Sequence, residues 1–143
     1  MKKQDLIILA FLPTVLGIVL LVVSAYLEPV WIVLQVAAAV LLAVIWWLLG
    51  RWCAGQDKNL WNGFALLQWW GVVNFVFSLI SSVSVLQSLA QMYASCMGFL
   101  LLPVLGIVPS VVQLPLMVLI TLALTMAAYV VGFTGVSNKR GRL

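Results

Sequence analysis

The sequence predicts an all-α integral membrane protein, a bundle of helices that cross a lipid bilayer. Of its 143 residues, 66% are hydrophobic and only 7% are charged, and the mean hydropathy is +1.25. Soluble domains carry about 45–50% apolar and about 25% charged residues. A soluble fold of this length leaves much of its surface exposed and cannot hide so many apolar side chains. The excess apolar surface is therefore expected to face lipid.

Apolar runs define the predicted spans. Each run is long enough, at about 1.5 Å per residue, to cross a hydrocarbon core of about 30 Å. In the first run, Pro13 and Gly17 predict a local bend. Glu28 and Pro29 separate it from the second run, because the residue before a proline avoids the helical region. We predict one transmembrane domain over residues 1–143, with five spans at 6–27, 30–49, 63–82, 85–107 and 114–133.

The uncharged stretch over residues 84–133 leaves the number of crossings open. Its length matches two spans, which gives five crossings in total. Positive charge favours four crossings, with 84–110 as a re-entrant or interfacial segment, because an even number places every basic residue on the cytoplasmic side. We predict five crossings and keep four as the alternative. The basic residues concerned are Lys2, Lys3, Arg51, Lys58, Lys139, Arg140 and Arg142.

The residue inventory argues against an enzyme. The three acids, Asp5, Glu28 and Asp57, all lie outside the predicted spans or at their ends, and the chain has no histidine. Buried proton relays and nucleophilic triads are therefore not expected. Cys53 and Cys96 have no CxxC spacing, so we expect no metal and no cofactor. The basic residues are dispersed in short clusters, so nucleic acid is not an expected partner.

A polar stripe runs along the third predicted span. Gln68, Gly71, Asn74, Ser78 and Ser81 recur at spacings of three and four, which places them on one helical face. An unpaired amide in hydrocarbon costs several kcal/mol, so this face should point into the bundle. It would serve either as interhelical hydrogen bonding, worth about 0.6–2 kcal/mol per contact, or as a site for a small polar ligand.

Trp69 and Trp70 lie beside this stripe, in a chain that holds seven tryptophans. Indole rings settle at headgroup depth, but these two lie about two turns inside the span. They would either form the wall of a ligand pocket or anchor the helix at a thick interface.

A second polar stripe follows in the predicted fourth span. Its members are again three or four residues apart, and if it faces the first stripe the two would line a polar interior. Such an interior suits a neutral solute or a polar headgroup. The alternative is an amphipathic helix that lies flat at the interface. The residues are Ser84, Ser88, Gln91 and Ser95, with Gln87 beside them.

Small residues form two packing faces. Small side chains let helix backbones approach closely, which is how helices associate in lipid. The faces would pack within the chain or form a seam for a second copy or another subunit. They consist of Ala39 and Ala43 in the second span and Thr121, Thr125, Ala128 and Gly132 in the last.

These features lead to one function hypothesis and one alternative. The first is a non-catalytic subunit or scaffold in a homo- or hetero-oligomeric complex of a bacterial-type plasma membrane. Its partners would be the lipid bilayer and other membrane helices. The alternative is a binder or transporter of a small neutral or amphiphilic solute or lipid, through an interior lined by Gln, Asn, Ser and Trp side chains.

Overall fold

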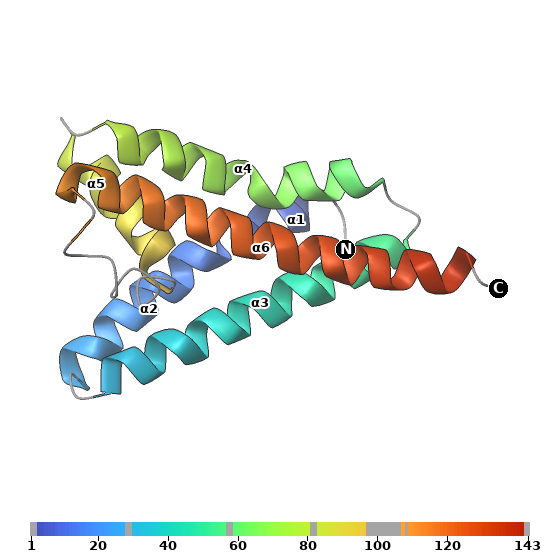
Figure 1. Ribbon diagram of the computed structural model, residues 1–143, viewed down its shortest axis with the longest axis horizontal. Helices are drawn as coiled ribbons and strands as arrows, with labels where there is room; N and C mark the ends of the chain where they lie inside the picture. Colours follow the sequence, from blue (N-terminus) through green and yellow to red (C-terminus); the bar gives the residue numbers. More distant parts are fainter. Residues whose placement is uncertain are drawn as a thin grey trace.

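The computed structural model describes residues 3–27, 30–56, 59–80, 83–96, 107 and 109–141. This part of the chain is helical throughout and contains no strand (Figure 1). The helices are α1 (Lys3–Leu9), α2 (Leu12–Tyr26), α3 (Trp31–Gly55), α4 (Leu60–Leu79), α5 (Ser84–Ala94) and α6 (Ser110–Gly141).

Three helical stretches are long and apolar enough to cross a membrane: Gln4–Tyr26, Ile32–Gly55 and Val112–Val136. They coincide with the first, second and last predicted spans. α4 has 20 residues, about 30 Å of helix, but its polar residues lower its hydropathy, so it is not among the three. Its first turn is capped by Asn59, whose side chain accepts a hydrogen bond from the Trp61 amide at 3.3 Å.

The bend predicted in the first span lies at Ala10 and Phe11, between α1 and α2. Pro13 is at the start of α2, and it has no amide hydrogen and a ring that clashes with the carbonyl four residues earlier. The helix therefore breaks just before it. Gly17 has another role, because a Cβ there would collide with the Met92 backbone of α5.

α3 and α6 extend beyond the predicted spans. α3 continues to Gly55, so Gly50 and Arg51, which lie beyond the predicted span 30–49, are helical. α6 begins at Ser110, directly after Pro109, and continues to Gly141. The added residues at these helix ends include polar residues and glycines. A hydropathy pattern does not distinguish such a helix end from a loop.

α6 lies between α3 and α4 in the view of Figure 1, and these two helices are its main neighbours. α3 runs parallel to it, since Val44 shares a groove with Leu124 and Arg51 shares a notch with Val136 further along both helices. α4 runs antiparallel to it. The start of α4 approaches Tyr129, whose hydroxyl lies 3.4 Å from the Leu60 carbonyl oxygen, whereas Gly71 approaches Leu122.

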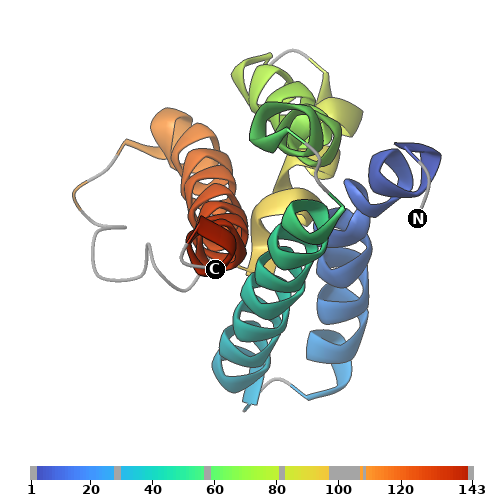
Figure 2. The same ribbon diagram turned by 90° about the vertical axis from the view of Figure 1, so that its right-hand side faces the viewer.

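α5 is much shorter than its neighbours. Its 11 residues give about 16 Å of helix, and it packs against α2, α4 and α6 (Figure 2). Its last turn reaches the middle of the bundle, where Tyr93 contacts Gly71 of α4. The predicted fourth span coincides with α5 in its first part only, and residues 97–106 of it lie outside the described residues.

The buried apolar residues form two clusters. One surrounds Trp46 and joins Leu6 of α1 to Cys53 of α3 and Tyr129 of α6. The other surrounds Tyr93 of α5. The first cluster places α1 near the end of α3. The last turns of α6 reach the same end of the bundle (Figure 1).

Candidate functional site

The polar stripe of α4 faces inward, as its periodicity predicted. Gln68 is 3% exposed, Asn74 is fully buried, and Gly71 and Ser78 are buried as well. Ser81, the last member of the stripe, lies outside the described residues. The remaining question is whether these side chains contact other helices or line a cavity.

Gln68 joins α4 to α6. Its amide lies 3.3 Å from the hydroxyl of Thr125, which is also fully buried. The same hydroxyl reaches the Thr121 and Leu122 carbonyl oxygens of its own helix, at 2.9 and 3.0 Å. The contact is therefore a side-chain bridge between two helices.

Gly71 makes room for α5 at the same level. A Cβ at this position would overlap the Tyr93 hydroxyl and would lie 3.1 Å from the Leu122 Cγ atom. The Tyr93 hydroxyl also lies near the Thr125 side chain of α6. α4, α5 and α6 thus meet around one hydroxyl-rich contact.

Trp69 and Trp70 pack against the break between α1 and α2. The ring of Phe11 lies 5.3 Å from Trp69 and 4.6 Å from Trp70, measured between centroids. Trp70 Nε1 donates a hydrogen bond to Thr14 Oγ1 at 2.8 Å. Both indoles therefore anchor the N-terminal helices to α4.

Some buried polar atoms have no partner among the described residues. Asn74 Nδ2 donates to the Trp70 carbonyl oxygen at 2.8 Å, whereas Asn74 Oδ1 is unpaired. Gln35 donates to the Ser95 carbonyl oxygen at 2.9 Å and leaves its Oε1 unpaired. The Nε1 atoms of Trp46 and Trp69 are also unpaired.

The second stripe does not face the first. Ser84, Ser88 and Gln91 are exposed, and the face that α5 turns to the bundle is apolar: Ala90, Tyr93 and Ala94. These residues let α5 approach its neighbours closely. The predicted polar interior between the two stripes is therefore wrong for these three side chains, although Ser95 is buried.

Gln87 has a structural role that the sequence did not reveal. Its Nε2 lies 3.0 Å from the Ser78 carbonyl oxygen, 2.9 Å from that of Ile80 and 3.4 Å from that of Phe77. Carbonyl groups in the last turn of a helix have no partner within that helix. Gln87 thus caps the C-terminal end of α4 from α5.

The small-residue faces pack within the chain. Ala39, Thr121, Thr125 and Gly132 are buried, and Ala43 and Ala128 are half-buried. A Cβ at Gly132 would collide with the Trp47 carbonyl group of α3. Intrachain packing thus occupies most of both faces.

Gly50 is a packing residue that the sequence analysis missed. A Cβ here would collide with the Tyr129 backbone and lie 3.0 Å from the Phe133 nitrogen. The signal was its spacing, since Gly50 follows Ala43 by seven residues and shares its helical face. With Gly132, it brings the backbones of α3 and α6 into contact.

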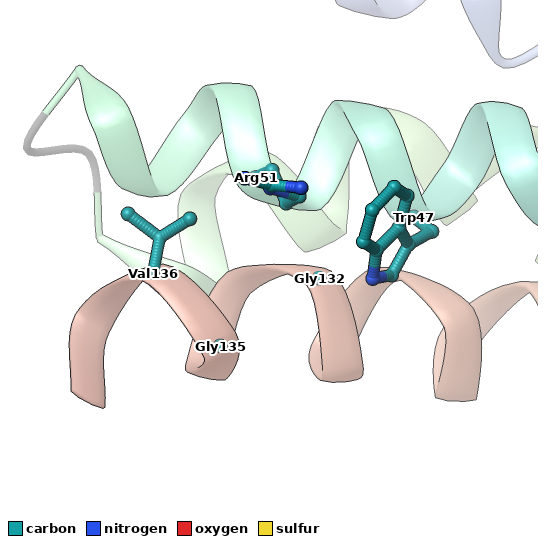
Figure 3. A pocket seen from close by; sticks show the side chains of 5 residues that line it. All are labelled: Trp47, Arg51, Gly132, Gly135 and Val136. Carbon is teal, nitrogen blue, oxygen red and sulfur yellow. The ribbon is translucent and has the colours of Figure 1, made fainter. Parts of the chain in front are cut away.

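Two hollows follow one another along the surface between α3 and α6. The first is an apolar groove lined by Ala43, Val44, Trp47, Leu124, Ala127, Ala128 and Val131. The second is a notch lined by Trp47, Arg51, Gly132, Gly135 and Val136 (Figure 3). In the notch the Arg51 guanidinium carbon lies 4.8 Å from the centroid of the Trp47 ring.

Among the described residues, no three His, Cys, Asp or Glu side chains lie close enough to hold a metal ion. Cys53 and Cys96 are both buried and free of disulfides. No protein-family model, curated protein or solved structure matches the chain.

Proposed function

We propose that this chain is a non-catalytic polytopic membrane protein that serves as a structural subunit or scaffold in a homo- or hetero-oligomeric membrane complex. The proposal rests on the contacts that the polar stripe and the neighbouring Trp70 make with other helices. Gln68 contacts Thr125 at 3.3 Å and Trp70 contacts Thr14 at 2.8 Å, so these side chains join helices. Such contacts stabilise a bundle in lipid and require no substrate.

The arrangement of helices supports four crossings, which was the alternative topology. α1 with α2, α3, α4 and α6 would each cross the bilayer, while α5, at about 16 Å, is too short to cross it. Both termini and the α3–α4 connection would then lie on one side. All seven basic residues would be cytoplasmic, in line with the usual bias of membrane proteins.

The outer surface supports contact with lipid or with other membrane helices. On α2, Val15, Val19 and Val22 are each more than half exposed, and on α3 so are Val33 and Val40. In water such helical faces would form apolar patches of the kind that mark interaction surfaces. A bilayer or a partner helix would cover them.

Native mass spectrometry of protein released from lipid nanodiscs, with cross-linking in intact membranes, tests the proposal. We expect a discrete oligomer or a stoichiometric partner. A monomer that carries no partner in both experiments would contradict the subunit role.

Cysteine labelling tests the topology separately. In a background that lacks Cys53 and Cys96, single cysteines at Gln4 and Leu143 should be labelled only from the cytoplasmic side. A cysteine at Leu27 should be labelled only from the other side. Labelling of Leu143 from the outside would restore the five-crossing prediction.

The alternative function, binding or transport of a small neutral or amphiphilic solute, has one observation in its favour. Asn74 Oδ1 and Trp69 Nε1 are buried on α4 without a partner among the described residues. A bound solute could satisfy them. Replacement of Asn74 by leucine separates the two functions.

A further inference from the structure

The groove and the notch between α3 and α6 form one continuous surface feature. They share Trp47, and Val131 of the groove directly precedes Gly132 of the notch. Small residues create the hollow, since a Cβ at Gly135 would meet nothing within 4 Å. The hollow is thus open at the surface, beside the packed contact made by Gly50 and Gly132.

The two hollows lie at different depths along the helices. Arg51 follows Val44 by seven residues, about 10 Å of helix, and Val136 follows Leu124 by twelve residues, about 18 Å. Arg51 is close to the end of α3, whereas Ala43 and Leu124 lie well inside the apolar stretches Ile32–Gly55 and Val112–Val136. A molecule that fills both hollows must be polar at one end and apolar along the rest.

The polar end of the hollow favours an anion. Among the described residues that line the notch, the exposed Arg51 is the one charged side chain and none is acidic. The guanidinium rests on the Trp47 ring, which holds it in place by a cation–π contact. A planar guanidinium fork binds phosphate through two parallel hydrogen bonds. Lys139 and Arg140 follow Val136 within about one turn of α6.

We propose that α3 and α6 form a binding site for an anionic phospholipid. The phosphate binds Arg51 in the notch, the Trp47 indole lies at the boundary between headgroup and hydrocarbon, and one acyl chain lies in the groove along Ala43, Ala127 and Leu124. Basic pockets between membrane helices on the cytoplasmic side are typical sites for such headgroups. This inference goes beyond the proposed function and does not depend on a partner protein.

The test compares lipids retained by the protein in native mass spectrometry. Nanodiscs contain phosphatidylcholine and phosphatidylglycerol in equal amounts, and the number of each lipid that remains bound is counted. Wild-type protein should retain phosphatidylglycerol preferentially. Arg51→Gln should lower that preference about tenfold, the size expected for the loss of charge-assisted hydrogen bonds to phosphate. Arg51→Lys, which keeps the charge but loses the fork, should fall between them.

Two further variants separate headgroup from chain. Lys3→Gln removes one positive charge from the first residue of α1, a helix that lies across the bundle from α6 (Figure 2), and should leave the preference unchanged. Ala127→Phe fills the groove from an exposed position and should reduce the retention of both lipids. Circular dichroism and the midpoint of thermal unfolding check that each variant is folded.

Three outcomes would overturn the proposal. One is equal retention of the two lipids by the wild-type protein. Another is a loss of preference in Lys3→Gln as large as in Arg51→Gln, which would indicate net charge alone. The third is loss of an oligomer in Ala127→Phe with lipid retention intact, which would show that a second copy covers the groove. The same spectra give the oligomeric state of Arg51→Gln, which tests the subunit role separately from lipid binding.

Discussion

α6 packs against its two main neighbours by different physical means. Toward α4 the contact is made by side chains: Gln68 reaches Thr125 at 3.3 Å, and the Leu122 side chain packs against Gly71. Toward α3 the contact is made by backbones, at Gly50 and Gly132. A side-chain contact can adjust by rotation, whereas a backbone contact cannot. We therefore expect the α3–α6 interface to be less tolerant of added volume than the α4–α6 interface.

The largest expected effect is at Gly132. A Cβ here would lie 2.9 Å from the Trp47 carbonyl carbon, and the neighbouring atoms are backbone. Gly132→Ala should therefore lower the free energy of unfolding by about 1–3 kcal/mol, the usual cost of overpacking. Unfolding in mixed micelles, followed by titration with sodium dodecyl sulfate, measures the change.

Gly135→Ala is the matched control, one turn away on the same helix. A Cβ at Gly135 meets nothing within 4 Å, so this substitution should stabilise the helix by about 0.5–1 kcal/mol because it removes backbone freedom from the unfolded state. Opposite signs for the two substitutions would confirm the backbone contact. Equal effects would show that α3 and α6 are not in contact there.

The Gln68–Thr125 contact should have a smaller effect. Gln68→Leu keeps the volume and removes the bridge, and Thr125 retains the Thr121 and Leu122 carbonyl oxygens as acceptors. We expect a loss of about 0.6–2 kcal/mol. A double-mutant cycle with Thr125→Val isolates the pair, and the double variant should lose less stability than the two single variants summed. Gln91→Leu, at an exposed position of α5, is the control. Additive single effects would show that the two side chains act independently.

Gly71 offers a direct test of the difference between the two interfaces. A Cβ at Gly71 would meet the far ends of the Tyr93 and Leu122 side chains, which can rotate away. Gly71→Ala should cost about 1 kcal/mol, less than Gly132→Ala, with part of the loss offset by the better helix propensity of alanine. Tyr93→Phe removes the hydroxyl in the way and should rescue part of the loss. A Gly71→Ala cost that exceeds the Gly132→Ala cost would reverse the comparison.

The sequence predicted the parts of the fold that depend on local pattern. Composition predicted an all-helical chain with apolar stretches of membrane-spanning length, Pro13 predicted the break between α1 and α2, and the spacing of Gln68 and Asn74 predicted the buried face of α4. Each follows from the geometry of one helix. The role of Gln87 did not follow, because its acceptors are carbonyl groups at the end of another helix.

Features that depend on contacts between distant segments could not be predicted. The length of α5 is one, because an uncharged, apolar sequence is compatible with both a full crossing and a half-length helix that packs against α2, α4 and α6. The role of Gly50 is another, since its partner is Tyr129 in the last helix. The notch also needs both helices: the sequence shows Arg51 at the end of a span, but not that Gly132 and Gly135 lie opposite.

The smallest expected effect on stability is at Asn74, where the two proposed functions diverge. Asn74 Nδ2 donates to a carbonyl oxygen of its own helix, and Oδ1 has no partner among the described residues. Leucine has a similar volume and removes the unpaired oxygen, whose burial is costly. Asn74→Leu should therefore change the free energy of unfolding by less than about 1 kcal/mol.

If the chain is a scaffold, Asn74→Leu should also leave its oligomeric state and its retained lipids as they are in the wild type. If the interior binds a solute, the same variant should fold normally and lose a small molecule that co-purifies with the wild-type protein, which mass spectrometry of denatured samples detects. A destabilisation above about 2 kcal/mol would show that Oδ1 has a strong partner after all. The unpaired oxygen would then be part of the helix-joining network, on the same footing as Gln68.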